Sequence, residues 1–252
     1  MDIQKALFDY TLRLGDNALI LGHRLSEWCG RGPILEQDIA MTNIALDLIG
    51  QARSLLQYAG EIEGKGRTED DLAFLRDISA YRNVLLVEQP NEDFAFTMVR
   101  QFFYDNYSFH FYTALLKSTD KTLAAIAEKS LKEVRYHLRY SSEWMIRLGD
   151  GTEESNQKMQ KALNQMWMYQ GELLTMNETD RALAAEGIGV DLEALKPAFD
   201  AKLAEILTEA TLEMPTGTWM QKGGKEGKHS EHLGFILAEM QYLQRAHPGA
   251  TW

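Results

Sequence analysis

The sequence predicts an all-α protein built around a bundle of long helices. Apolar residues recur at i, i+3, i+4 and i+7 over long segments, which is the period of an amphipathic helix. No segment shows the alternating Val, Ile and Thr runs that are typical of a β-sheet. The 252-residue chain has only five prolines, and four of them stand in short breaks between the periodic segments. Long helices joined by short breaks indicate a helical bundle.

Stop and start residues separate the expected helices. Gly64, Gly66 and Thr68 divide the second helix from the third. We expect Asn91 to be the N-cap of the fourth helix. The Gly-Asp-Gly-Thr segment 149–152 ends the fifth helix and caps the sixth. The expected helices cover about 4–29, 35–62, 69–87, 92–118, 120–148, 153–175, 178–186, 191–213 and 229–246.

Charge and cysteine content exclude several classes of protein. Lys and Arg number 26 and Asp and Glu number 37, so the net charge is −11. An acidic chain lacks the positive surface needed for general binding to nucleic acid or anionic lipid. The single cysteine, Cys29, forms no intrachain disulfide and fits a reducing compartment. With no apolar run near the ~20 residues of a membrane span and no signal peptide, we expect a cytoplasmic protein.

The fourth expected helix is unusually rich in aromatic residues. Between Phe94 and Tyr112 it carries nine Phe and Tyr side chains. A helix that is apolar nearly all round is buried on most sides. It therefore forms either the centre of a large bundle or half of a subunit interface.

Four acids lie within apolar stretches of four different long helices. An ionised carboxylate in a core costs several kcal/mol, so each must be paired, solvated or bound to a metal. One interpretation is a hydrogen-bonded polar cluster that fixes the register of the bundle, with its charge balanced by a base such as Arg13, Lys129 or Arg135. The four acids are Asp16, Asp47, Asp105 and Glu133.

The other interpretation is a di-metal centre. Ferritin-like di-iron proteins take one acid from each of two helices and Glu-x-x-His from each of two others. The positions three residues after Asp47 and Glu133 are Gly50 and Tyr136, and neither is an imidazole. His137 lies one residue late, about 100° round the helix. We therefore favour the polar cluster, and an independent di-metal oxidase that uses the rotated His137 remains the alternative.

Several long strings of the sequence carry a family resemblance. They include YTLRLGDNALILGHRLSEWCG at 10–30, NIALDLIGQARSLLQYAGE at 43–61, LLVEQPNEDFAFTMVRQFFYD at 85–105 and KEVRYHLRYSSEWMIRLGDGTEES at 132–155. The series continues with KMQKALNQMW at 158–167 and GKHSEHLGFILAEMQYLQRAHPGATW at 227–252. In these strings the sequence resembles the PaaA/PaaC proteins of phenylacetate degradation. These are subunits of the bacterial ring-1,2-phenylacetyl-CoA epoxidase, and the similarity is to the structural C type.

The resemblance implies a ferritin-like long four-helix bundle with additional helices, as a single domain over 1–252. It implies a heteromeric monooxygenase whose catalytic A-type chain holds the di-iron centre and binds the coenzyme A thioester. A reductase supplies electrons from NADPH, and phenylacetyl-CoA becomes its 1,2-epoxide. A C-type chain has lost the iron ligands and scaffolds the A-type chain, as Gly50 and Tyr136 suggest. The resemblance thus implies no catalytic, cofactor-binding or metal-ligating residue in this chain, and leaves self-association open.

Two motifs near the C-terminus admit alternatives. His229 and His232 are three residues apart, and we interpret them as a surface pair rather than a metal site. The Gly-rich segment 223–227 is expected to be a flexible loop. Together with Lys222 and Lys228 it leads into a helix N-terminus that could hold a phosphate. An acyl-CoA-binding accessory protein is therefore a further alternative, beside contact with an acidic partner and a plain linker.

Overall fold

The computed structural model describes residues 2–217 and 219–250. Over these residues it contains helices and no strand, which confirms the predicted all-α class. The chain divides into two compact units. Unit 1 is formed by the described residues of Met1–Pro90 and Gly223–Trp252, and unit 2 by those of Asn91–Lys222. The expectation of a single domain over 1–252 stays a prediction.

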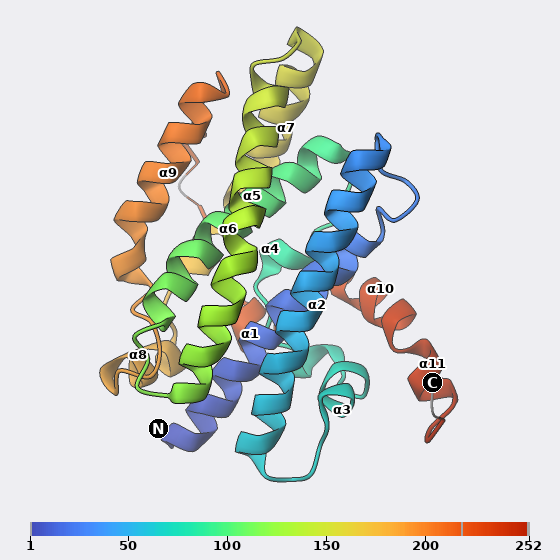
Figure 1. Cartoon of the computed structure of the whole chain (residues 1–252), viewed down its shortest axis with the longest axis vertical. Helices are drawn as coiled ribbons and strands as arrows, with labels where there is room; N and C mark the ends of the chain where they lie inside the picture. The colour runs from blue at the N-terminus through green and yellow to red at the C-terminus, as the bar shows by residue number, and fades with distance from the viewer. Residues whose placement is uncertain (1, 218, 251–252) are drawn as a thin grey trace. The chain divides into compact units, whose positions relative to one another are not determined.

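Unit 1 is built on an antiparallel pair of long helices, α1 (Ile3–Ser26) and α2 (Leu35–Glu63) (Figure 1). The helices approach closely because glycines of α1 face α2. A Cβ on Gly15 would lie 2.8 Å from Cδ2 of Leu56. Gly64 ends α2 in the left-handed conformation, with φ of 67°, and donates its N–H to Gly60. This is a common way for a helix to end, because glycine alone adopts that conformation without strain.

The segment expected as one helix over 69–87 is instead broken into three short pieces. They are α3 (Glu69–Phe74), a 3₁₀ turn η1 (Ile78–Ala80) and α4 (Leu85–Glu88). Two main-chain N–H groups that a helix would use internally bind side chains of α1. Arg82 N donates to Oδ2 of Asp16 over 2.9 Å, and Val84 N donates to Oδ1 of Asn17 over 2.8 Å. Tertiary hydrogen bonds therefore replace helical ones here.

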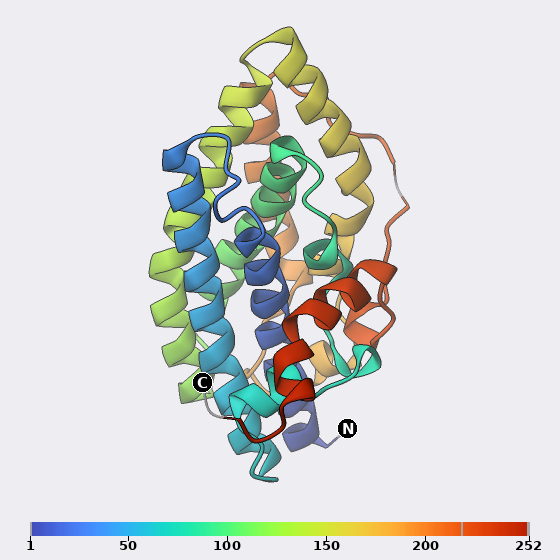
Figure 2. The ribbon, with the colours of Figure 1, turned by 90° about the vertical axis from the view of Figure 1, so that its right-hand side faces the viewer.

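The C-terminal part of unit 1 packs on this broken segment. It consists of η4 (Gly224–Glu226), α10 (Glu231–Met240) and α11 (Tyr242–Ala246), so the helix expected over 229–246 is interrupted. The interruption is at Gln241, whose Nε2 donates to the carbonyls of Ala73 and Arg76 and to the Tyr81 hydroxyl. Figure 2 shows these helices, in red, beside α3 in teal.

The prediction of a flexible loop at 223–227 is wrong. Gly223, Gly224 and Lys225 are buried in the structure. A side chain at Gly224 would collide with the carbonyl oxygen of Asn83. The glycines in this segment thus permit close packing of one main chain on another.

The described residues of unit 2 form α5 to α9 and two 3₁₀ turns. Its long helices, α5 and α6, pack together, and Asp93 rather than the predicted Asn91 caps α5 by accepting from Phe96 N over 3.1 Å. Asn91 instead binds the guanidinium of Arg100 over 2.6 Å. The elements are α5 (Phe94–Leu115), α6 (Lys121–Gly149), α7 (Glu153–Gln170), η2 (Gly171–Leu174), α8 (Glu178–Ala185), η3 (Glu193–Leu195) and α9 (Lys196–Glu209).

The aromatic helix is α5, and it is buried as its composition predicts. Seven of its nine Phe and Tyr side chains between Phe94 and Tyr112 are buried within this chain, so they contribute to a core. That outcome favours the centre of a bundle over a subunit interface. No helix in the described part of the chain is long and apolar enough to cross a membrane.

Candidate functional site: buried acids in two units

The four acids singled out from the sequence have two different environments. Asp16, on α1 in unit 1, and Asp105, on α5 in unit 2, are fully buried. Asp47 on α2 and Glu133 on α6 are only half-buried. The prediction of four core carboxylates therefore holds for two of them. Asp47 and Glu133 lie at the border between the buried and the exposed face of their helices. Their apolar neighbours in the sequence did not reveal this position.

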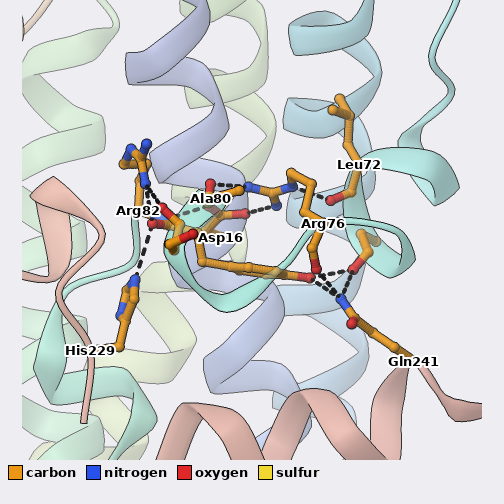
Figure 3. Close-up of polar contacts among 10 residues, drawn as sticks. Asp16, Leu72, Arg76, Ala80, Arg82, His229 and Gln241 are labelled. Carbon is orange, nitrogen blue, oxygen red and sulfur yellow. Dashed lines mark hydrogen bonds and ion pairs between the residues drawn. The ribbon is translucent and has the colours of Figure 1, made fainter.

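Asp16 is neutralised by a buried arginine that sequence reasoning missed. The guanidinium of Arg76 binds both carboxylate oxygens, with Nη1 3.0 Å from Oδ2 and Nη2 on Oδ1 (Figure 3). The side chains of this pair are 4% and 0% exposed. Arg76 also donates to the carbonyls of Leu72 and Ala80. Burial opposes the positive charge, but the Asp16 carboxylate outweighs it and raises the pKa of Arg76.

The predicted counter-charges, Arg13, Lys129 and Arg135, are thus not what balances Asp16. Arg76 was not identified because it lies 60 residues from Asp16 in an irregular segment. Its guanidinium also stacks over the ring of Tyr81, 4.1 Å from the ring centre. No spacing rule connects an arginine in a loop to a carboxylate on a helix. Only the tertiary structure brings the two together.

A second buried ion pair joins Glu88 to His229. Nδ1 of His229 lies 2.9 Å from Oε2 of Glu88, and the two side chains are 1% and 0% exposed. Glu88 also accepts from Asn83 Nδ2 over 3.0 Å and from Ser230 N over 2.6 Å. The interpretation of His229 as one of a surface pair is therefore wrong for this residue. An acid within the apolar run LLVEQP was the available signal in the sequence.

The helix N-terminus proposed for a phosphate already carries a carboxylate. Ser230 precedes α10, and its N–H binds Glu88. Of the loop lysines, Lys225 is buried, while Lys222 and Lys228 are exposed. The loop thus packs into unit 1 and does not form an open anion site at this position.

Asp105 differs from Asp16 in that its hydrogen-bond donors are neutral side chains. Gln101 Nε2 donates to Oδ1 over 2.7 Å, and Ser141 Oγ donates to Oδ2 over 2.8 Å. Burial raises the pKa of Asp105 to about 6, although the charge of His137 and the two hydrogen bonds oppose this rise. His137 itself is fully buried on α6. Unit 2 therefore contains a carboxylate that ionises with difficulty.

The residues do not fit a di-iron centre. Asp16 is committed to Arg76, and Gly50 has no side chain to offer a metal. Tyr136 is 40% exposed and stacks on Tyr140, with ring centres 6.2 Å apart. Over residues 2–217 and 219–250, no group of three or more His, Cys, Asp or Glu side chains is arranged to hold a metal ion. The absence of metal ligands in this chain nevertheless remains a prediction.

Comparison with known proteins identifies the family of this chain. A family model described as phenylacetic acid catabolic protein (PaaA_PaaC) matches residues 2–252. The chain belongs to this family. It is 53% identical over 243 residues to the C-type chain of the 1,2-phenylacetyl-CoA epoxidase of Escherichia coli (strain K12), and the match covers 96% of this chain and 98% of that protein.

The predicted resemblance to C-type epoxidase chains is confirmed, and the match extends over both compact units. The helical structure agrees with the ferritin-like bundle expected for this family. Unit 1 contains the pair of long helices α1 and α2, and unit 2 contains the pair α5 and α6.

Proposed function

We propose that this chain is a non-catalytic structural subunit of a multicomponent phenylacetyl-CoA epoxidase. In this role it binds and stabilises the di-iron catalytic subunit during aerobic phenylacetate catabolism in the cytoplasm. The 53% identity to a C-type epoxidase chain supports membership of such a complex. The pairing of Asp16 with Arg76 carries the finer claim that the chain does not catalyse the reaction.

A carboxylate binds a metal ion well only if another cation does not already neutralise its charge. Both oxygens of Asp16 accept from the Arg76 guanidinium, and Oδ2 also accepts from Arg82 N. A cation placed on this carboxylate would lie next to the buried positive charge of Arg76, where Coulomb repulsion is strong. Imidazole, a preferred iron ligand, is absent at positions 50 and 136. In this proposal the chain therefore contributes helices and a contact surface to the complex, and it contributes no metal ligands.

The proposed mechanism is thermodynamic. A partner that binds only the folded form of another chain stabilises that form by RT ln(1 + [L]/Kd), about 2.7 kcal/mol at a hundredfold excess over Kd. Obligate interfaces often exceed ~2,000 Å² of buried surface. In this proposal the catalytic subunit holds the iron and the acyl-CoA, and a reductase delivers electrons from NADPH.

The first test co-expresses this chain with a di-iron catalytic subunit of the family. We expect the two to co-purify, and the catalytic subunit to have a higher unfolding midpoint and higher epoxidase activity with the reductase than when expressed alone. An unrelated acidic protein at the same concentration is the control. If the catalytic subunit alone is equally stable and active, a stabilising role for this chain is contradicted.

The second test counts iron on the isolated chain. The protein is loaded anaerobically with excess ferrous iron, freed of unbound metal and assayed for iron per chain. We expect well under one atom per chain, because Asp16 is held by Arg76. A value near two, with an oxo-bridge absorption after exposure to air, would support an independent di-metal oxidase instead. This readout does not depend on the partner.

A further inference from the structure

We infer that residues 223–241 act as a latch, a segment that packs on α4 and the residues before it. The latch stays packed only while His229 is the imidazolium ion. The Glu88–His229 pair and the main-chain bond from Ser230 to Glu88 hold this segment to α4. It would open as the solution becomes alkaline. The inference is independent of the proposed function, because it concerns only contacts within unit 1.

The geometry around the imidazole requires two donors. Nδ1 lies 2.9 Å from Oε2 of Glu88, and Nε2 lies 3.0 Å from the main-chain oxygen of Tyr81. The main-chain oxygen of Tyr81 is an acceptor only, and so is Glu88 as the carboxylate, the form that accepts from Asn83 Nδ2 and Ser230 N. A neutral imidazole has one N–H, so one of its nitrogens would face an acceptor oxygen with a lone pair. The imidazolium donates to both, and it is therefore the form that fits this site.

The charges around the ring also favour the cation. Glu88 contacts it directly, and Asp16 acts on it through the interior. Arg82 opposes these acids, because its guanidinium shares the Tyr81 carbonyl over 2.7 Å. Other charged groups lie on the elements packed around the pair. Arg24 of α1 donates to the main-chain oxygen of Glu88. Asp16 of α1 binds Arg76 and the N–H of Arg82, Lys225 of η4 is buried, and Glu231 of α10 is exposed.

The raised pKa of His229 sets the direction of the pH effect. Burial lowers the pKa of His229, but the hydrogen bonds to Glu88 and Tyr81 and the nearby carboxylates outweigh burial and raise it above its usual 6.5. A group whose pKa is higher in the closed state stabilises that state below its open-state pKa, and this stabilisation is lost as pH rises through the closed-state pKa. The latch is therefore firm at acidic pH and weakens above about 6.5.

The test measures hydrogen exchange of residues 228–241 in the full chain between pH 6 and 9. Rates are expressed as protection factors, so that the intrinsic pH dependence of exchange cancels. We expect protection to fall by up to about tenfold for each pH unit between about 6.5 and the closed-state pKa, and then to level off. Glu88→Gln and His229→Gln are expected to flatten this profile. His232→Gln, three residues further along in α10, is expected to keep it.

Two results would overturn the inference. The first is a wild-type pH dependence that survives in His229→Gln or disappears in His232→Gln. The second comes from an NMR titration of the His229 ring in the wild-type chain, which does not require any variant to fold. A neutral ring at pH 6 would show that the site does not require the imidazolium.

Discussion

Replacing Arg76 by methionine is expected to lower the free energy of unfolding by about 3–5 kcal/mol. Methionine preserves much of the length of the side chain but removes the charge that balances Asp16. The carboxylate is fully buried, so water cannot replace the lost guanidinium. Of the two groups that donate to Asp16, the Arg76 guanidinium and Arg82 N, Arg82 N would remain. Breaking one half of a buried pair leaves an uncompensated charge, which costs more than the pair contributes when intact.

Denaturant unfolding of the isolated chain measures this loss, with Arg53→Met as the matched control. Arg53 pairs with Glu69 over 3.2 Å, but its side chain is 70% exposed. Exposed pairs contribute about 0–1 kcal/mol, so the control should change little. Adding Asp16→Asn to Arg76→Met should recover part of the loss, because it removes the unpaired charge. Equal small losses in both arginine variants would show that Asp16 is not held by Arg76 in solution.

Replacing Asp105 by asparagine is expected to stabilise the chain by about 1–3 kcal/mol at pH 8. Burial raises the pKa of Asp105 to about 6, so the folded state binds this proton more tightly than the unfolded state. The stability linked to the protonated form is present at low pH and is lost as pH rises from about 4 through about 6. A rise of that size in the pKa corresponds to about 3 kcal/mol at higher pH. Asparagine avoids this cost.

The neighbours of Asp105 can accommodate the amide. Its oxygen can accept from Gln101 Nε2, as the carboxylate does over 2.7 Å. Its NH₂ group can donate to Ser141 Oγ, which lies 3.0 Å from the main-chain oxygen of His137 and can donate there in turn. The amide is nearly the same size as the carboxyl group. The hydrogen bonds are therefore kept while the buried negative charge is removed.

Unfolding measured at pH 8 and at pH 4.5 separates this effect from a packing change. The gain should shrink at pH 4.5, where Asp105 is largely protonated in the folded chain. Asp150→Asn, an exposed change at the end of α6, should stay within about 0.5 kcal/mol at both values. A large loss of stability in Asp105→Asn at pH 8 would instead indicate that the carboxylate fixes the register of its helices, as an ion pair with His137 would allow.

The two predictions rest on residues that the sequence reveals to different degrees. Asp105 is identified by an acid within an aromatic helix, and its Gln101 neighbour one turn away is its partner in the structure. Local helical spacing predicts such contacts well. For Asp16 the acid is identifiable and its partner is not, because Arg76 comes from the segment expected to be a continuous helix. The helical periodicity of residues 69–87 did not reveal the tertiary hydrogen bonds that interrupt the helix.

By itself the sequence determined the all-α class, the long helices α1, α2, α5 and α6, and membership of the phenylacetic acid catabolic family. These follow from the 3.6-residue period of apolar side chains and from long matching strings, which are local properties of the chain. Only the tertiary structure decided that Arg76 neutralises Asp16, that Glu88 pairs with His229, and that the 223–227 loop is packed. Those contacts join residues 60 to 141 positions apart. A buried charge takes whichever partner the fold brings within reach, and sequence spacing does not encode that choice.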